Sequence, residues 1–144
     1  MPKSTTFSND ILALILNGTA IADLAENDAT SPLATLYLRL HTADPGVGGS
    51  QLTNEIGYDN YAAEGVARTT GGFTAPSGGS STNVALEQFP QCGASGATAT
   101  HVSLGTEPTG AGKVLYAGAL NSPLAISNLV RPQFAPGDLT VTES

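Results

Sequence analysis

The chain has 144 residues, of which only 12% are charged, and twelve acidic against five basic side chains give a net charge of −7. Phosphate neutralisation needs clustered Lys and Arg, so the few scattered basic residues argue against a surface that binds nucleic acid. No apolar run approaches the roughly 20 residues that span a bilayer, and no signal-like core follows the N-terminus, so we expect cytoplasmic synthesis and no membrane anchor.

Residues 8–17 are the one clear helix that the sequence predicts. Ser8, Asn9 and Asp10 supply capping oxygens and first-turn acidity, and Asn17-Gly18 is a typical helix end. Between these ends, apolar side chains form a broad face that either a sheet or another subunit must cover. The residues of this face that we expect at an interface are Ile11, Leu12 and Ile15.

An alternating strand is predicted at residues 36–41. Its three leucines fall on one face, while Tyr37, Arg39 and His41 fall on the other. Asp44-Pro45-Gly46 then supplies a side-chain acceptor, a fixed φ and a residue that tolerates positive φ, which is the chemistry of a turn. The pattern predicts a half-buried strand that leaves its sheet at this turn.

Two long polar segments follow this strand. Residues 46–60 form a loop longer than about 12 residues, a length that is usually functional or flexible. Residues 76–81 form a second loop without a core-forming side chain. Tyr58 and Tyr61 lie in or beside the first loop, and we favour a core or interface role for them over an aromatic platform that binds sugar.

The remaining strands are short and are separated by Gly, Pro, Asn and Asp. Some seven to nine strands indicate an all-β fold, an antiparallel β-sandwich over about residues 34–142 with one N-terminal helix beside it. No composition break requires a second domain, so residues 1–144 are expected to form a single domain. The sequence has no collagen-like or heptad period, which argues against a long fibre shaft. The further strands are predicted at residues 58–68, 73–75, 83–89, 98–106, 113–120, 124–126, 130–134 and 139–141.

Few residues suggest chemistry. His41 and His101 are the only histidines, and a metal or catalytic role for them would need an oriented partner such as Asp44. They lie close together if their strands are neighbours. A calcium site among Asp44, Asp59 and nearby carbonyls stays open. The sequence has no nucleophile elbow, phosphate loop or spaced carboxylate pair, and the single Cys92 cannot form an internal disulfide, so we expect no enzyme activity, no catalytic residue, no metal and no cofactor.

Six segments together form a family signature: residues 36–46 (LYLRLHTADPG), 53–55 (TNE), 61–62 (YA), 99–106 (ATHVSLGT), 112–120 (GKVLYAGAL) and 134–140 (FAPGDLT). In this order they resemble small virion proteins of tailed bacteriophages, which are described as tail-fibre or minor structural proteins. The resemblance implies a place in the virion after synthesis in the host cell. It supplies no catalytic residue.

Composition and resemblance together predict a structural virion protein. Small neutral side chains lose little entropy when a neighbour covers them, which favours a chain that works in an assembly over a soluble β-domain of the same composition. Our leading hypothesis is a decoration or cement protein on the outside of the capsid, a small homo-oligomer that contacts the major capsid protein or other virion proteins. The alternative is a tail-fibre or adsorption module that binds a host-surface receptor through the loops at 44–60 and 75–82. A third hypothesis, a hydrolase, is not supported by any motif in the sequence.

Overall fold

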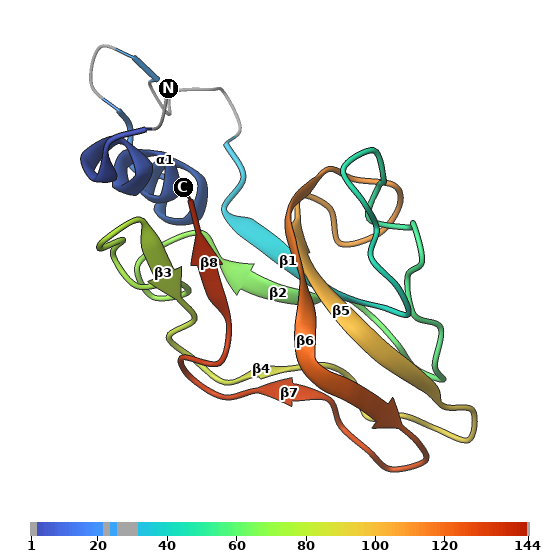
Figure 1. Ribbon diagram of the computed structural model, residues 1–144. Coiled ribbons are helices and arrows are strands. Elements are labelled where there is room, and N and C mark those ends of the chain that lie inside the picture. The colour runs from blue at the N-terminus through green and yellow to red at the C-terminus, as the bar shows by residue number, and fades with distance from the viewer. Residues whose placement is uncertain (1–2, 22–23, 26–31, 144) are drawn as a thin grey trace. The chain divides into compact units, whose positions relative to one another are not determined.

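The computed structural model describes residues 3–21, 24–25 and 32–143, which form one helix and eight strands (Figure 1). The elements are α1 (Thr5–Asn17), β1 (Thr35–His41), β2 (Glu64–Ala67), β3 (Ser80–Thr82), β4 (Glu87–Gln88), β5 (Ala97–Gly105), β6 (Val114–Ile126), β7 (Gln133–Phe134) and β8 (Thr140–Thr142). One sheet has the strand order β2-β1-β5-β6, while β3 pairs with β8 and β4 pairs with β7. The predicted all-β fold with one N-terminal helix is confirmed.

The chain divides into two compact units that alternate along the sequence. Unit 1 contains Met1–Thr35, Ala67–Leu86 and Phe134–Ser144, and unit 2 contains Leu36–Val66 and Glu87–Gln133. Each unit is therefore assembled from segments that are far apart in sequence. The expected single domain stays a prediction.

In unit 1, α1 begins at Thr5 rather than at residue 8. Ser4 is its N-cap, because its backbone is extended and its hydroxyl oxygen accepts a hydrogen bond from the Phe7 amide at 3.2 Å. Ser8 is left inside the helix, where it is buried, so the prediction that residues 8–10 form the cap was wrong. The helix ends as predicted, with Gly18 in the left-handed region at φ 68°. Within the described residues no helix is both long and apolar enough to cross a membrane.

Arg68 stabilises the C-terminal end of α1 from another segment of unit 1. Its Nε donates to the Ile15 carbonyl at 2.7 Å, and a terminal guanidinium nitrogen donates to the Leu14 carbonyl. The last turn of the helix has no basic residue of its own. Because the final carbonyls of a helix carry partial negative charge and lack helical partners, a cation from elsewhere in the chain supplies the missing contacts.

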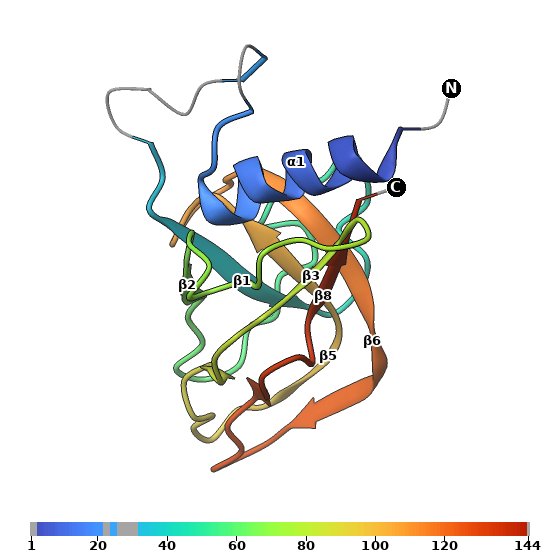
Figure 2. The same ribbon diagram turned by 90° about the vertical axis from the view of Figure 1, so that its left-hand side faces the viewer.

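The β3–β8 pair completes unit 1, and α1 contacts β3 (Figure 2). The two strands are antiparallel, with Ser81 opposite Val141. Our assignment of residues 76–81 to a loop was wrong for its last two residues. Ser81 is buried, and its hydroxyl donates to the Thr74 carbonyl at 2.7 Å. Since a buried hydroxyl with a backbone acceptor costs little, a serine-rich segment can form a strand that buries one of its side chains.

In unit 2, β1 is an interior strand whose four last residues are all buried. The prediction of a half-buried strand was wrong, because residues 51–56 fold back over its second face. There the His41 ring lies 3.0 Å from the Thr53 carbonyl oxygen, and Glu55 pairs with Arg39. β5 pairs with β1 in antiparallel fashion and places His101 directly opposite His41, as expected for neighbouring strands. Ser103 of β5 is also buried.

Candidate functional site

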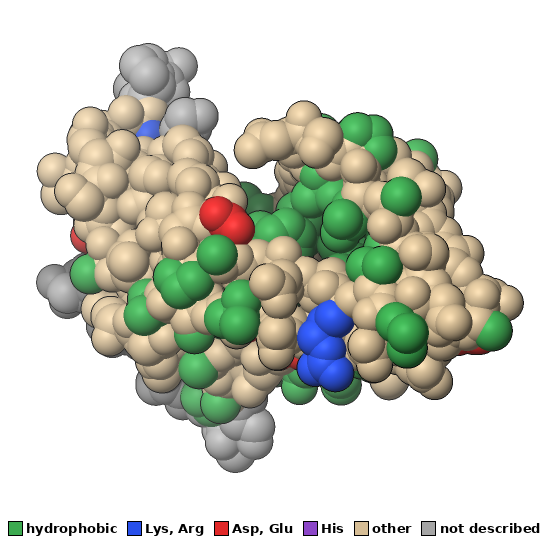
Figure 3. Space-filling model, turned by 90° about the horizontal axis from the view of Figure 1, so that it is seen from below, with side chains coloured by type: hydrophobic (Ala, Val, Ile, Leu, Met, Phe, Trp, Pro, Cys, Tyr) green, Lys and Arg blue, Asp and Glu red, His purple; other side chains and the backbone are tan. Residues whose placement is uncertain are grey.

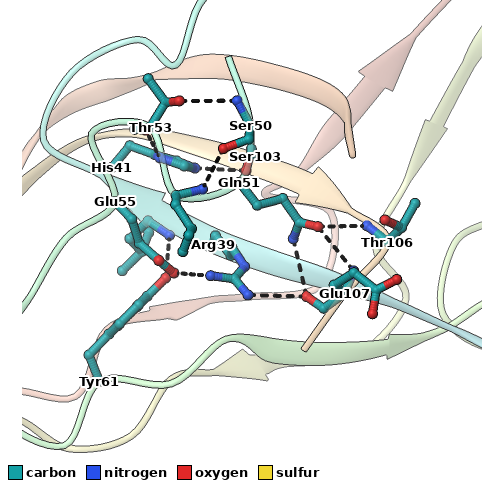
Figure 4. A network of polar contacts seen from close by, with 12 residues as sticks. Arg39, His41, Ser50, Gln51, Thr53, Glu55, Tyr61, Ser103, Thr106 and Glu107 are labelled. Atoms are coloured by element: carbon teal, nitrogen blue, oxygen red, sulfur yellow. Dashed lines mark hydrogen bonds and ion pairs between the residues drawn. The ribbon is translucent and has the colours of Figure 1, made fainter. Parts of the chain in front are cut away.

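Arg39 of β1 lies at the centre of a polar network inside unit 2 (Figure 4). Its guanidinium forms an ion pair with the Glu55 carboxylate and donates to the Glu107 carbonyl at 3.2 Å. Only 3% of Arg39 is exposed, and its Nε is the one buried side-chain nitrogen or oxygen without a hydrogen-bond partner in the part of the chain that the structure describes. Because an unpaired buried charge is costly, these two contacts of Arg39 fix where Glu55 and the Glu107 carbonyl lie against the sheet.

Gln51 extends the network to the turn between β5 and β6. Its Oε1 accepts from the amides of Thr106 and Glu107 at 3.1 and 3.0 Å, and its Nε2 donates to the Glu107 carbonyl at 3.2 Å. A Cβ on Gly112 would lie 1.7 Å from Oε1, so only glycine leaves room for this side chain. Sequence reasoning missed Gln51, since a single glutamine in a polar loop carries no signal of burial.

His41 and Ser103 form a buried dyad. His41 Nδ1 lies 3.0 Å from the Thr53 carbonyl oxygen, which can only accept, so Nδ1 carries the proton. Nε2 then accepts from the Ser103 hydroxyl at 2.7 Å. Burial lowers the pKa of His41, which agrees with a neutral ring. A serine beside a histidine base resembles a nucleophilic pair, but both side chains are shielded from solvent and nothing places a reacting group against them.

Tyr58 and Tyr61 are brought together, as part of the packing of unit 2. Their ring centroids are 5.2 Å apart in an edge-on arrangement, and Tyr61 stacks on Phe89 at 6.2 Å. The Tyr58 hydroxyl donates to the Pro90 carbonyl at 2.9 Å, and burial raises the pKa of Tyr58 to about 12. Burial also raises the pKa of Tyr61, whose hydroxyl accepts from the Leu40 amide at 3.1 Å. The two rings therefore join the loop to β1 and do not form an open platform.

The helix residues that were predicted at an interface differ in exposure. Leu12 is fully buried, whereas Ile11 and Ile15 are half-buried. The chain itself thus covers the centre of the apolar face of α1 and leaves its flanks partly open. Their role at an interface stays a prediction.

The carboxylates considered for calcium have backbone partners. An Asp44 oxygen accepts from the Gly46 amide at 2.8 Å, and an Asp59 oxygen accepts from the Ser95 amide at 2.9 Å. Asp44 therefore acts as a turn acceptor, whereas Asp59 joins its loop to the distant segment at Ser95. In the described ranges no group of three His, Cys, Asp or Glu residues is arranged to hold a metal ion. A cleft of about 310 Å³ in unit 1, beside the first turn of α1, is lined by Lys3, which pairs with Glu143.

β6 is the other distinctive feature of unit 2. It is 13 residues long, it contains no ionisable residue other than Tyr116, and seven of its residues are exposed, including Ala117, Gly118 and Ala119. The sequence predicted two strands here, at 113–120 and 124–126, because Asn121-Ser122-Pro123 is typical of a turn. The structure joins them into one strand. The face in Figure 3 shows the same scarcity of charge, with many hydrophobic side chains and few charged ones.

A comparison with known protein families matches residues 2–142 to the family described as Podophage GP4 fiber I protein gp80. No curated protein matches the chain. The match covers both units and agrees with the resemblance to virion proteins of tailed bacteriophages that the sequence carries.

Proposed function

We propose, from the premise that this chain belongs to the family of podophage GP4 fiber I protein gp80, that it is a structural subunit of the virion fibre. Family membership makes the chain a bacteriophage fibre or structural protein, which works in contact with other virion components. The match over residues 2–142 is the observation that carries the proposal. Within the fibre, the chain acts as a rigid folded piece and not as a repeating shaft.

The geometry of unit 2 supports a mechanical role. The ion pair of Arg39 and the contacts of Gln51 lock the loop and the β5–β6 turn to the sheet, so the unit keeps one shape under load. The uncharged, exposed β6 offers a surface on which another subunit can lie without desolvating charges.

The loop at residues 46–60 favours structure over receptor binding. Its side chains at Gln51, Ile56 and Tyr58 are buried and hold the loop against the rest of the unit. The exposed residues are spread along the loop, from Val47 to Asn60. A receptor-binding edge usually presents polar and aromatic side chains outward, and here both tyrosines point into the unit.

A capsid decoration protein is the second candidate. It is favoured by the lack of any collagen-like or heptad repeat in the sequence and by the acidic composition, which suits an outer surface away from packaged nucleic acid. On this hypothesis the same neutral surfaces join shell subunits.

Purified virions decide between the two locations. We expect quantitative mass spectrometry to find few copies per particle, and electron microscopy with a labelled antibody to place them at the tail. A copy number comparable to that of the shell subunits, with label spread over the capsid, would assign the chain to capsid decoration instead.

We further propose that the protein is not an enzyme. Purified wild-type protein should leave host-surface polysaccharides and peptidoglycan intact, since the buried Ser103–His41 pair cannot reach them. Detectable hydrolysis by the wild type that disappears in a His41→Gln variant would overturn this assignment.

A further inference from the structure

The turn between β6 and β7 holds a leucine in a backbone conformation that leucine rarely adopts (Figure 1). Leu129 has φ 68°, in the left-handed region. In the described part of the chain two other non-glycine residues have a positive φ, and both are asparagines, Asn54 and Asn60. Asparagine tolerates this region because its short polar side chain can bond to the local backbone, whereas a leucine side chain only adds crowding. The backbone is therefore strained at Leu129.

Hydrogen bonds on both sides hold Leu129 in this conformation. The Val130 amide donates to the Ser127 carbonyl at 2.9 Å, which closes a four-residue turn with Leu129 at its third position. The Leu129 amide donates to the Cys92 carbonyl at 3.0 Å, and the Leu129 carbonyl accepts from the side-chain amide of Gln91 at 2.8 Å. A third position with positive φ is normally glycine or asparagine. The turn is thus fixed in a shape that another residue would fit with less strain.

The fold itself offers little compensation for this strain. Leu129 is 70% exposed, so its side chain buries little apolar surface within the chain. Residues that are held in rare backbone conformations gather at functional and ligand-binding sites, where the strain serves a contact. An apolar side chain on a rigid turn is also pre-organised for binding, because ordering the turn costs nothing further. These features point to a partner that covers Leu129.

Arg131 indicates the charge of that partner. Three of the five basic residues bind acceptors within the chain, namely Lys3, Arg39 and Arg68. Arg131 is exposed two residues beyond Leu129, and neither ion pair of the described residues includes it. A guanidinium beside an apolar side chain is complementary to an apolar pocket with a carboxylate at its rim. Two copies of this chain repel one another through a net charge of −7 each, so the pocket belongs to a different protein.

We propose that Leu129 and Arg131 form a docking point for another virion protein, which receives Leu129 in an apolar pocket and pairs a carboxylate with Arg131. The proposal rests on the proposed function in that the partner is a component of the virion. It predicts an unusual combination of effects. Relief of the strain at Leu129 should stabilise the fold and at the same time weaken assembly.

Leu129→Asn tests the strain. Asparagine fits the left-handed region better than leucine, so we expect the midpoint of thermal unfolding of the purified chain to rise by about 2–4 °C. Val47→Asn is the matched control, because Val47 is also an exposed apolar residue of unit 2 and does not have a positive φ. Its midpoint should change by less than about 1 °C.

The same variants test the contact. Phage is grown on host cells that also express a tagged copy of the chain, and mass spectrometry measures the ratio of tagged to untagged chain in the cells and in purified virions. Relative to the tagged wild type, Leu129→Asn should enter virions at least about fivefold less, as for loss of an anchor residue. Leu129→Met, which keeps the apolar volume, and Val47→Asn should enter within about twofold of the wild type.

Two further variants identify the partner. Arg131→Glu should reduce entry as strongly as Leu129→Asn, whereas Arg131→Lys keeps the charge and should retain most of it. Leu129→p-benzoylphenylalanine, illuminated in intact virions, should cross-link to one virion protein other than this chain, at a peptide that contains Asp or Glu.

A midpoint of Leu129→Asn that stays level or falls would overturn the proposal, since the backbone is then unstrained or the chain itself covers the side chain. Normal entry of Leu129→Asn into virions, or cross-links to copies of this chain alone, would do the same. Location in the virion is measured separately. Label over the capsid would refute the fibre assignment and leave the contact standing, whereas normal entry of Leu129→Asn at the tail would refute the contact alone.

Discussion

β1 and β6 belong to the same sheet and distribute charge in opposite ways. β1 holds Arg39 and His41 in the interior, each with a partner from a loop, whereas β6 exposes most of its length and carries no charge. Soluble monomers usually show the reverse arrangement, with apolar strands inside and charges outside. The comparison teaches that buried charge in this chain fixes its own shape, while β6 presents a neutral surface, on which we propose that other virion components lie.

Arg39→Ala tests most directly whether the buried charge of β1 stabilises the sheet. The variant leaves Glu55 without its cation in a mostly buried position, and we expect a loss of about 3–5 kcal/mol in the free energy of unfolding, measured by urea denaturation. Arg131→Ala, which removes an exposed arginine of the same unit, should change it by less than about 0.5 kcal/mol. Equal effects of the two variants would mean that the buried pair does not hold the sheet.

Gln51→Ala should have the next largest effect. It removes the acceptor for two backbone amides and the donor to the Glu107 carbonyl, so we expect a loss of about 2 kcal/mol. The control is Gln91→Ala, because Gln91 is exposed and makes one contact, to the Leu129 carbonyl. Amide exchange at Thr106 and Glu107 should become faster in the first variant alone. Unchanged exchange at these amides would contradict the anchoring role.

His41→Gln tests the buried histidine of β1 through the pH dependence of the free energy of unfolding. Burial lowers the pKa of His41, so the unfolded chain binds the proton more readily, and stability falls as the pH drops through 6.5. At neutral pH the variant should lose about 1–2 kcal/mol. The difference from the wild type should shrink on acidification, because only the wild type suffers the protonation penalty. Thermal melts between neutral and mildly acidic pH measure this.

Glu64 and Glu87 change the stability with pH in the direction opposite to His41, but they do not obscure the result. Burial raises the pKa of both carboxyls, so their contribution to stability becomes less unfavourable as the pH falls toward 4.5. Both groups are present in the wild type and in His41→Gln, and their effect cancels in the difference. A difference that does not vary with pH would show that His41 is not neutral in the fold.

Ala119→Lys on β6 should have the smallest effect on the fold. Ala119 is exposed, so we expect the free energy of unfolding of the monomer to change by less than about 0.5 kcal/mol. Denaturation at low protein concentration measures it apart from association. A clear loss would show that the chain itself covers this part of β6.

The sequence predicted those parts of the fold that depend on local pattern. β1, β5 and the end of α1 follow from alternation and from Asn17-Gly18, whereas the sequence placed His41 near His101 only on the condition that their strands are neighbours, which the structure meets. The sequence could not predict the burial of Arg39 and His41, because the residues that cover them, 51–56, lie in a loop that has no apolar pattern of its own. Position on the polar face of an alternating strand predicted exposure, and long-range packing overrode it.

The candidate site was predictable only in part. Tyr58 and Tyr61 were expected in a core or at an interface, and the packing of Tyr58 against Tyr61 and of Tyr61 against Phe89 makes them part of the interior of unit 2. The absence of charge from residue 114 to residue 126 was visible in the sequence. The prediction of two strands there was wrong, because Asn121-Ser122-Pro123 is typical of a turn and the structure has one strand. A turn-like triplet can sit in a bulge when both flanks pair with the same neighbour.

The alternation of the two units along the chain has a consequence for how the protein is made. Unit 2 closes once Gln133 has left the ribosome, whereas β3 must wait for β8, since Ser81 and Val141 are sixty residues apart. Leu12 and Leu16 of α1, which contacts β3, are buried in the complete fold, so we expect them to be less well enclosed during that wait. We therefore expect a chain that stops before Thr140 to expose an aggregation-prone helix. Only chains that are translated through β8 would then enter assembly.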